Sequence, residues 1–349
     1  PHMSMKSGFL MCLLCLMVAC AASPAAPAFS GKQKRELKPN PAAQVEALLK
    51  QYISAQGPGA AVLVLKNGQQ VYGTGRGRAN VKTGAPIGLD TAFYLASVSK
   101  QFTAMAVMLL AEDGKLAFDD PLKKHLPGLP YPGVTIRNLL THTSGIPEYF
   151  EPASAHFPLN HIITNQDLLE FYRKANLPAD FQPGERFEYS NTNYTLLASL
   201  VEKVSGKAFE VFLKERIFQP LGMKNTRVYH LNQPDSPPGR VYGMAKSGGK
   251  TYRDDLNHFD GLVGDGNLYA SARDLFTWMQ ALLKFRLVKK DTQREAWTPF
   301  KLNNGELSYY GFGWFLQKEA PVVAHTGSWA GFRTLVYLDT LSGLTLIVL

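Results

Sequence analysis

Three short motifs in the sequence contain the residue types that nucleophilic catalysis requires. The first is S-V-S-K, in which a three-residue spacing at the start of an expected helix places Ser97 and Lys100 on one face, about one turn apart. A serine hydroxyl is a weak nucleophile that needs a nearby base, and a helix N-terminus favours developing negative charge. The pattern alone is weak, because on the order of one chance match is expected in such a chain, and residues 247–250 are another match.

The second motif is Y-S-N, in which Tyr189 and Asn191 form the only Y-x-N among the 15 tyrosines. Because tyrosine titrates near pH 10, it can act as a base only where a cation such as Lys100 holds its proton loosely. The third motif, H-T-G at 325–327, follows a strand-like run. An edge strand lets a substrate lie alongside it and offers a backbone N–H to an oxyanion. Taken singly, each motif has an ordinary structural explanation. Y-S-N could be a loop before a helix, and H-T-G could be a β-turn with an incidental histidine.

The surrounding pattern predicts the elements that position these motifs. Apolar residues at helical spacing indicate a helix over 41–56, and two apolar runs around Asn67-Gly68 indicate a hairpin. Further helices are predicted at 98–112, 193–204 and 271–283. Strand-like runs return at 309–316, 322–324, 334–338 and 344–349. Strands at both ends around a helical middle predict an α/β fold of the α+β type, with one sheet built from the two terminal segments and a large, mainly helical insertion.

In this order and spacing, the three motifs resemble those of the penicillin-recognising serine hydrolases. That family includes class C β-lactamases, D-alanyl-D-alanine carboxypeptidases and β-lactamase-like esterases. Four more stretches look like its signatures: D-D-P at 119–121, L-L-T-H-T-S-G-I-P at 139–147, P-L-G-M at 220–223 and G-N-L at 266–268. The resemblance implies a single β-lactamase-like domain over residues 41–349, with an antiparallel sheet flanked by helices.

The resemblance also implies roles for the residues of the motifs. Ser97 is expected to be the acylated nucleophile, with Lys100 and Tyr189 sharing the general acid/base work. Asn191 is expected to orient Lys100 and to hold a substrate amide. The backbone N–H groups of Ser97 and Ser328 are expected to form the oxyanion hole. His325, Thr326 and Gly327 are expected to contact the carboxylate or acyl side of the substrate. The family chemistry implies no metal and no cofactor.

One residue departs from the usual family pattern. His325 stands where lysine is common, and a histidine near pH 7 is largely neutral unless its surroundings raise its pKa, so a fixed cation for a β-lactam carboxylate is lost. Lys318 and Arg333 are alternative sources of that charge. A literal K-T-G begins at Lys82, but it precedes the nucleophile, whereas the family places this motif last, so we assign it to a hairpin loop.

Residues 1–30 have the composition of a leader for export. The start P-H-M is typical of an expression remnant, and the apolar run at 9–22 fits the core of a secretory signal. M-V-A-C resembles a bacterial lipobox, in which Cys20 would be the lipidated residue. Ordinary signal-peptide cleavage after Ala21 is an equal alternative. Both predict an exported protein, either periplasmic or lipid-anchored to the outer membrane, with residues 31–40 as a tether. All three cysteines lie within the leader, which excludes a disulfide framework or a thiolate metal site elsewhere.

Composition limits the classes of function. The 349 residues are 45% hydrophobic with a net charge of +9, and the basic residues form no long run, which argues against a nucleic-acid partner. We therefore expect an exported serine hydrolase that forms an acyl-enzyme with an amide or ester: a D-amino-acid peptide (including a cell-wall peptide), an ester or a β-lactam. The alternatives are a class C-type β-lactamase proper and a non-catalytic penicillin-binding sensor or cell-wall receptor. Because the family continues into a helix where this sequence ends at Leu349, we expect that final helix to be missing.

Overall fold

The computed structural model describes residues 41–229, 237–255 and 257–349. The expected leader at 1–30, the tether at 31–40 and Cys20 lie outside the described residues. Within the described ranges, no helix is both long enough and apolar enough to cross a membrane.

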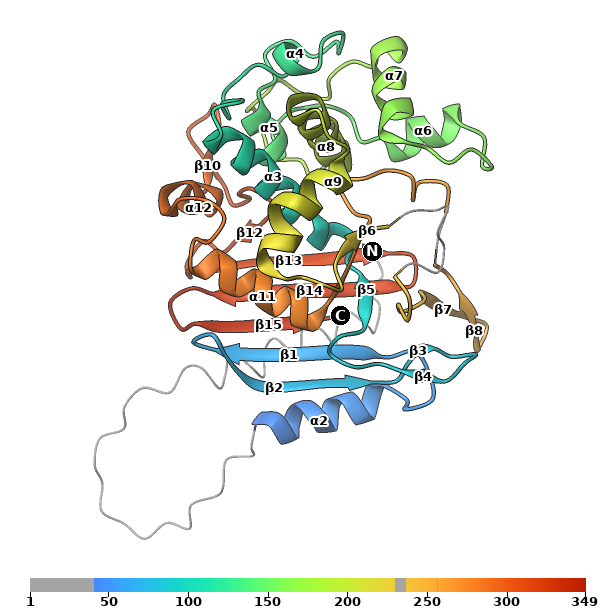
Figure 1. The fold of residues 1–349 in the computed structure, drawn as a ribbon. Helices are drawn as coiled ribbons and strands as arrows, with labels where there is room; N and C mark the ends of the chain where they lie inside the picture. The colour runs from blue at the N-terminus through green and yellow to red at the C-terminus, as the bar shows by residue number, and fades with distance from the viewer. Residues whose placement is uncertain (1–40, 230–236, 256) are drawn as a thin grey trace, which may run out of the picture.

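A six-stranded antiparallel sheet joins the two ends of the described chain (Figure 1). Its strand order is β12-β13-β14-β15-β1-β2, and the terminal segments meet where β1 pairs with β15, with Val62 opposite Val348. The strands are β1 (Ala60–Lys66), β2 (Gln69–Arg76), β12 (Phe315–Leu316), β13 (Val322–Trp329), β14 (Phe332–Asp339) and β15 (Leu344–Val348). The expected sheet of N- and C-terminal segments is confirmed.

Alternating side chains of the strands form two apolar layers. On one face, Val62 and Val64 pack against Val45 and Leu49 of helix α2 (Pro41–Tyr52). On the other face, Leu63 and its alternate neighbours join the main core beneath the helical part of the molecule. Because side chains of a strand point to opposite faces in turn, each strand contributes to both layers. The sheet is therefore covered on both sides (Figure 1).

The helical insertion lies on the face opposite α2. The sheet-side helix α11 (Ala272–Leu283) packs on α3 (Lys100–Glu112), where the rings of Trp278 and Phe102 stack with centroids 4.3 Å apart. The other helices are α4 (Leu122–His125), α5 (Ile136–Leu140), α6 (Phe150–His156), α7 (Asn165–Ala175), α8 (Asn191–Ser205), α9 (Phe209–Leu213), the π-helix η2 (Lys214–Phe218), α10 (Gln219–Leu221) and α12 (Lys290–Ala296).

Shorter strands link the insertion to the sheet. A three-stranded sheet has the order β5-β9-β6, and the pairs β3-β4, β7-β8 and β10-β11 form small ribbons. Their bounds are β3 (Arg78–Asn80), β4 (Ala85–Pro86), β5 (Ala92–Tyr94), β6 (Arg227–Val228), β7 (Met244–Ser247), β8 (Lys250–Arg253), β9 (Leu268–Ser271), β10 (Phe300–Lys301) and β11 (Leu307–Ser308).

Two strand predictions differ from the structure. Of the expected strand 309–316, only β12 (Phe315–Leu316) forms in its second half. Gly313 has φ +80° and lies so close to α3 that a Cβ there would be 2.9 Å from the Gln101 Cα, so the chain turns instead of extending. The strand expected at 322–324 continues to Trp329, so the H-T-G motif lies within β13 and not in a turn after it.

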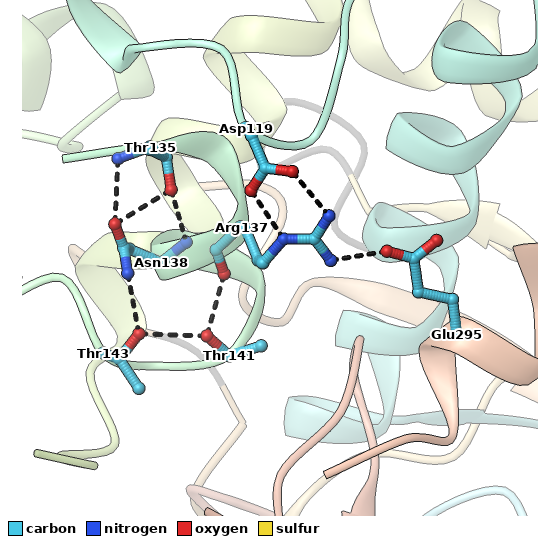
Figure 2. Close-up of polar contacts among 7 residues, drawn as sticks. All are labelled: Asp119, Thr135, Arg137, Asn138, Thr141, Thr143 and Glu295. Atoms are coloured by element: carbon cyan, nitrogen blue, oxygen red, sulfur yellow. Dashed lines mark hydrogen bonds and ion pairs between the residues drawn. The ribbon is translucent and has the colours of Figure 1, made fainter. Parts of the chain in front are cut away.

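A hydrogen-bonded cap fixes the segment that leads from α5 toward the middle of the insertion (Figure 2). Thr135 accepts from the backbone N–H of Asn138, whose side chain accepts from the backbone N–H of Thr135 in turn. The Asn138 Nδ2 also donates to Thr143 Oγ1 at 3.0 Å, and Thr141 shares a hydrogen bond with the same Thr143 hydroxyl. The reciprocal cap therefore fixes the N-terminus of α5, and the bond from Asn138 to Thr143 ties the segment after the helix to that cap.

Arg137 ties the same helix to a distant part of the chain (Figure 2). Its guanidinium donates through Nε and Nη2 to the two carboxylate oxygens of Asp119, at 2.7 and 2.9 Å, and through Nη1 to Glu295 in α12 at 2.5 Å. A planar fork meeting one carboxylate with two bonds fixes orientation as well as distance.

Candidate active site

The expected nucleophile is presented at a helix start under local constraint. Ser97 is the second residue of the 3-10 helix η1 (Ala96–Ser99), which continues into α3. Ala96, directly before it, has φ +49°, a left-handed conformation that non-glycine residues rarely adopt. The preceding Leu95 carbonyl accepts from Thr334 Oγ1 at 2.8 Å. The surrounding strands therefore hold the turn that exposes Ser97.

Gly327 permits the close approach of β13 to this turn. A Cβ at Gly327 would lie 2.2 Å from the Leu95 carbonyl oxygen and 2.2 Å from Thr334 Oγ1. No side chain fits in that space, so the glycine of the H-T-G motif allows β13 to approach the turn that carries the nucleophile.

Lys100 connects the first two motifs. Its buried ammonium donates to Ser97 Oγ at 3.2 Å, to Asn191 Oδ1 at 2.7 Å and to the backbone carbonyl of Asp265 at 2.7 Å. An ammonium has three donors, and here each has an acceptor. Asn191 is held in turn by Glu148, whose Oε2 accepts from its backbone N–H at 2.5 Å and from its Nδ2 at 3.2 Å. The amide oxygen of Asn191 is therefore fixed toward Lys100.

Tyr189 reaches the site through its ring. The Lys100 Nζ lies 5.0 Å from the ring centroid, and the hydroxyl is buried without a hydrogen-bond partner in the part of the chain that the structure describes. The ring packs on His142, with centroids 4.3 Å apart. The structure thus brings Tyr189 beside Lys100 without a bond from its hydroxyl to Ser97 or Lys100, and its share of the acid/base work stays a prediction.

His142, within the expected L-L-T-H-T-S-G signature, positions the Y-S-N segment. Its Nδ1 accepts from the backbone N–H of Ser190 and from Asn193 Nδ2, both at 3.2 Å. Burial, with the nearby charge of Lys100, lowers the pKa of His142 well below its usual value, so the ring is neutral. The geometry gives this histidine a structural task.

His325 is neutral and turned inward. Its Nδ1 lies 2.7 Å from the Thr326 carbonyl, which can only accept, so Nδ1 carries the proton and Nε2 accepts from the Tyr310 hydroxyl at 2.9 Å. Burial, followed by the charge of Lys100, lowers the pKa of His325 to about 3. Both ring nitrogens are used within the protein, and His325 contributes no cation; its contact with substrate stays a prediction.

The edge of β13 faces the nucleophile. Strand β12 pairs only with Val323 and Ala324 of β13, and beyond them no described strand covers this edge. Thr326 and Ser328 are exposed on it. The N–H of Ser97 lies in the first helical turn, where it has no acceptor within the helix. These are the two backbone positions where an oxyanion hole is expected.

A cavity of about 200 Å³ opens beside Ser97. Its polar lining residues are Asn191, Ser328, Asp260 and Asp265, together with Ser97 itself, and no lysine or arginine is among its described lining residues. The remaining lining residues are Tyr94, Ala96, Tyr149, Phe150, Phe259, Leu262, Gly266 and Trp329. The two alternative cations do not line it: Lys318 is exposed, and Arg333 donates to the carbonyls of its own strand end.

The carboxylates of this site were missed by sequence reasoning. Burial raises the pKa of Asp260 to about 6 and also raises the pKa of Asp265 and of Glu148. Glu148 and Tyr149 directly follow the expected 139–147 signature, and Asp265 directly precedes the G-N-L stretch. Acidic residues next to two recognised stretches were the available signal, but only the fold brings Asp265 to the cavity and Glu148 to Asn191.

The two decoy motifs lie on hairpin turns. Lys82-Thr83-Gly84 connects β3 and β4, as expected, and Ser247 and Lys250 flank the Gly248-Gly249 turn of the exposed β7-β8 ribbon. Among the described residues, no group of three or more His, Cys, Asp or Glu side chains is arranged to hold a metal ion.

A covered antiparallel sheet and a helix-start serine bonded to a lysine define a protein of the serine-hydrolase type. Comparison with known proteins agrees: residues 43–349 match the family described as Beta-lactamase. Penicillin-binding protein 4* of Bacillus subtilis strain 168 is 39% identical over 293 residues, which are 80% of this chain and 65% of that protein's length. The chain belongs to the β-lactamase family.

Solved structures show the same fold. The octameric penicillin-binding protein homologue from Pyrococcus abyssi superposes with a TM-score of 0.76 at 28% identity, covering 88% of this chain and 72% of that one. The penicillin-binding protein from Bacillus halodurans gives a TM-score of 0.71 at 29% identity, covering 82% and 89%. The expected β-lactamase-like fold is confirmed.

Proposed function

We propose that this protein is an exported serine hydrolase that cleaves an amide or ester through a covalent acyl-enzyme on Ser97. The observation that carries the proposal is the hydrogen bond of 3.2 Å between Lys100 Nζ and Ser97 Oγ at the wall of an open cavity. A nucleophile and its proton acceptor in contact are what acyl transfer needs, and a site for binding alone has no use for the pair.

In the proposed reaction, Lys100 first gives up one proton to solvent, and its neutral Nζ then accepts the proton of Ser97 Oγ while that oxygen attacks the substrate carbonyl carbon. The carbonyl oxygen gains negative charge between the N–H groups of Ser97 and Ser328. The bond to the leaving amine or alcohol then breaks, and the leaving group takes the proton. Water attacks the acyl-enzyme, gives up one proton to the same base, and releases the carboxylic acid with Ser97 restored. Tyr189 shares the proton transfers.

Amides and esters rank ahead of β-lactams as substrates. A β-lactam brings a carboxylate, and the described residues that line the cavity include two aspartates and neither a lysine nor an arginine. A neutral, inward-facing His325 does not supply one. Penicillin is therefore expected to acylate slowly, although the relatives named above are called penicillin-binding proteins.

The test is turnover of activated esters, D-alanyl peptides and a cephalosporin by the wild type, Ser97→Ala and Ser247→Ala. Ser247 begins the second S-x-x-K on the exposed β7-β8 ribbon and is the matched control. The proposal expects loss of turnover only in Ser97→Ala. Acylation of the wild type without measurable release would support the sensor alternative, and full activity of Ser97→Ala would refute the proposal.

Export is proposed from the leader sequence alone. Cell fractionation of the full chain is expected to place the protein in the periplasm or on the outer membrane. If Cys20 is lipidated, Cys20→Ala moves the protein from the membrane to the soluble fraction; an unchanged distribution would favour cleavage after Ala21. Recovery in the cytoplasm would contradict export.

A further inference from the structure

Lys100 makes two short hydrogen bonds to groups that form no bond with the substrate. Its Nζ donates to Asn191 Oδ1 and to the backbone carbonyl of Asp265, both at 2.7 Å, and the third bond, to Ser97 Oγ, is longer at 3.2 Å. A neutral amine has two N–H donors and one lone pair. With the two N–H groups directed to Asn191 and Asp265, the lone pair faces Ser97 Oγ, which is the geometry that proton transfer from this oxygen requires.

The first of these acceptors is held by Glu148. The carboxylate Oε2 of Glu148 accepts from the backbone N–H of Asn191 at 2.5 Å and from Asn191 Nδ2 at 3.2 Å. Its Oε1 accepts from the backbone N–H of Tyr149 at 2.9 Å. All three partners donate, which suits an ionised carboxylate. Because Glu148 binds the amide nitrogen of Asn191, the amide oxygen is the end that faces Lys100.

The second acceptor is held by Tyr149, the next residue along the chain. Its buried hydroxyl donates to Asp265 Oδ2 at 2.8 Å, so the residue whose carbonyl meets Lys100 is also fixed through its side chain. The preceding Gly264 has φ +107°, and a Cβ there would lie 2.3 Å from the Tyr194 carbonyl oxygen. This close packing against α8 leaves the backbone at Asp265 little freedom to move.

Two consecutive side chains therefore support both acceptors of one amine. Glu148 and Tyr149 lie directly before α6, whereas Asn191 begins α8 and Asp265 lies three residues before β9. One short segment thus connects two parts of the chain that are far apart in sequence, and both connections end at the same lysine of α3.

We propose that Glu148 and Tyr149 are positioning residues for the general base. By holding its two acceptors, they leave the lone pair of neutral Lys100 to receive the proton of Ser97. In this step the O–H bond of the serine breaks, a new N–H bond forms on Nζ, and the electron pair of Oγ forms the bond to the substrate carbonyl carbon. Neither positioning residue gains or loses a proton. This inference rests on the proposed hydrolase function.

The test is the rate of acylation by p-nitrophenyl acetate, measured by stopped flow over a range of ester concentrations. Glu148→Gln and Tyr149→Phe each weaken one support with little change of shape. Both are expected to lower the maximal acylation rate about tenfold or more, because a positioned base contributes about 10²–10⁴-fold. The ester concentration that gives half of the maximal rate is expected to change less than about threefold. A maximal rate within about twofold of the wild type in either variant would overturn the inference.

Two control variants remove similar contacts elsewhere. Tyr72→Phe deletes a hydroxyl that donates to the carboxylate of Glu46 at 2.9 Å, and Glu202→Gln replaces a carboxylate that accepts from the backbone N–H of Phe209 at 2.9 Å. Both are expected to keep the maximal acylation rate within about twofold of the wild type. A loss as large as that in the test variants would indicate a general effect of removing buried contacts and would overturn the inference.

A double-mutant cycle separates positioning from a purely structural role. In an Asn191→Ala background the amide through which Glu148 acts is absent, so adding Glu148→Gln is expected to slow acylation by less than about twofold more. Tyr149→Phe acts through the other acceptor and is expected to slow acylation about tenfold or more in this background as well. If Glu148→Gln were equally harmful in both backgrounds, its role would be structural and the inference would be overturned.

The Tm of each variant establishes that it is folded before its kinetics are compared. If Glu148→Gln fails to fold, Tyr149→Phe, which removes a single oxygen atom, still decides the inference by the same criterion. Failure of the wild type to acylate on Ser97 would refute the proposed function. Unchanged rates in the variants of a wild type that does acylate would refute the positioning role alone, so the two failures are distinguishable.

Discussion

Acidification is expected to destabilise the folded protein through His325. Its pKa is about 3 in the folded state because the ring is buried beside Lys100, and about 6.5 in an unfolded chain. Between these values the unfolded chain binds a proton that the folded protein does not. The free energy of unfolding therefore loses this contribution progressively as the pH falls from 6.5 to 3.

The size of the effect follows from the shift. Each pKa unit corresponds to about 1.4 kcal/mol, so the full difference between the folded and unfolded values amounts to about 5 kcal/mol. Between pH 6.5 and pH 4.5, where experiments are practical, His325 alone is expected to remove about 2 kcal/mol of the free energy of unfolding.

This contribution can be measured by urea unfolding, followed by tryptophan fluorescence. The wild type and His325→Gln are compared at pH 6.5 and pH 4.5. Glutamine cannot take up the proton, so the pH-dependent loss should be about 2 kcal/mol smaller in the variant. The raised pKa of Asp260, about 6, makes the folded protein more stable as the pH falls, whereas the lowered pKa of His142 makes it less stable, as for His325. Both residues are present in the wild type and in the variant, so their contributions cancel in the comparison. An equal pH dependence in the two proteins would refute the buried, neutral assignment.

Three substitutions test the framework around the nucleophile. Gly327→Ala forces a Cβ against the Leu95 carbonyl and is expected to cost about 1–3 kcal/mol, seen as a lowered Tm together with lost activity; a normal Tm would contradict the close approach. Asn138→Ala breaks the cap of α5 and is expected to lower the free energy of unfolding in urea by about 1–3 kcal/mol. An unchanged free energy of unfolding would refute the capping role of Asn138. Lys100→Met is expected to slow acylation of Ser97 by about 10²–10⁴-fold in stopped-flow assays, and a loss below tenfold would exclude Lys100 as the base.

The sequence predicted the architecture better than the detail of the site. The hairpin around Asn67-Gly68 and the Ser271 cap of α11 formed where expected, because local turn and capping chemistry determines both. The prediction of a strand over 309–316 was mostly wrong. The chain turns at Gly313 because that residue packs closely against α3, and no local sequence pattern indicates this contact.

For the site, spacing and resemblance identified Ser97, Lys100 and Asn191, which the structure joins by hydrogen bonds. The inward orientation of His325 depends on Tyr310, a partner whose role has no sequence signature. Asp260 and Asp265 reach one cavity only through folding, so the acidic character of the pocket could not be predicted from the chain.

The most direct test of the central claim is the intact mass of the protein after brief exposure to an activated ester, followed by peptide mapping. The wild type and Ser247→Ala are expected to gain one acyl group, located on the peptide that contains Ser97, and Ser97→Ala is expected to gain none. Labelling of Ser97→Ala to the level of the wild type, or an acyl group on any other residue, would contradict the assignment of Ser97 as the nucleophile.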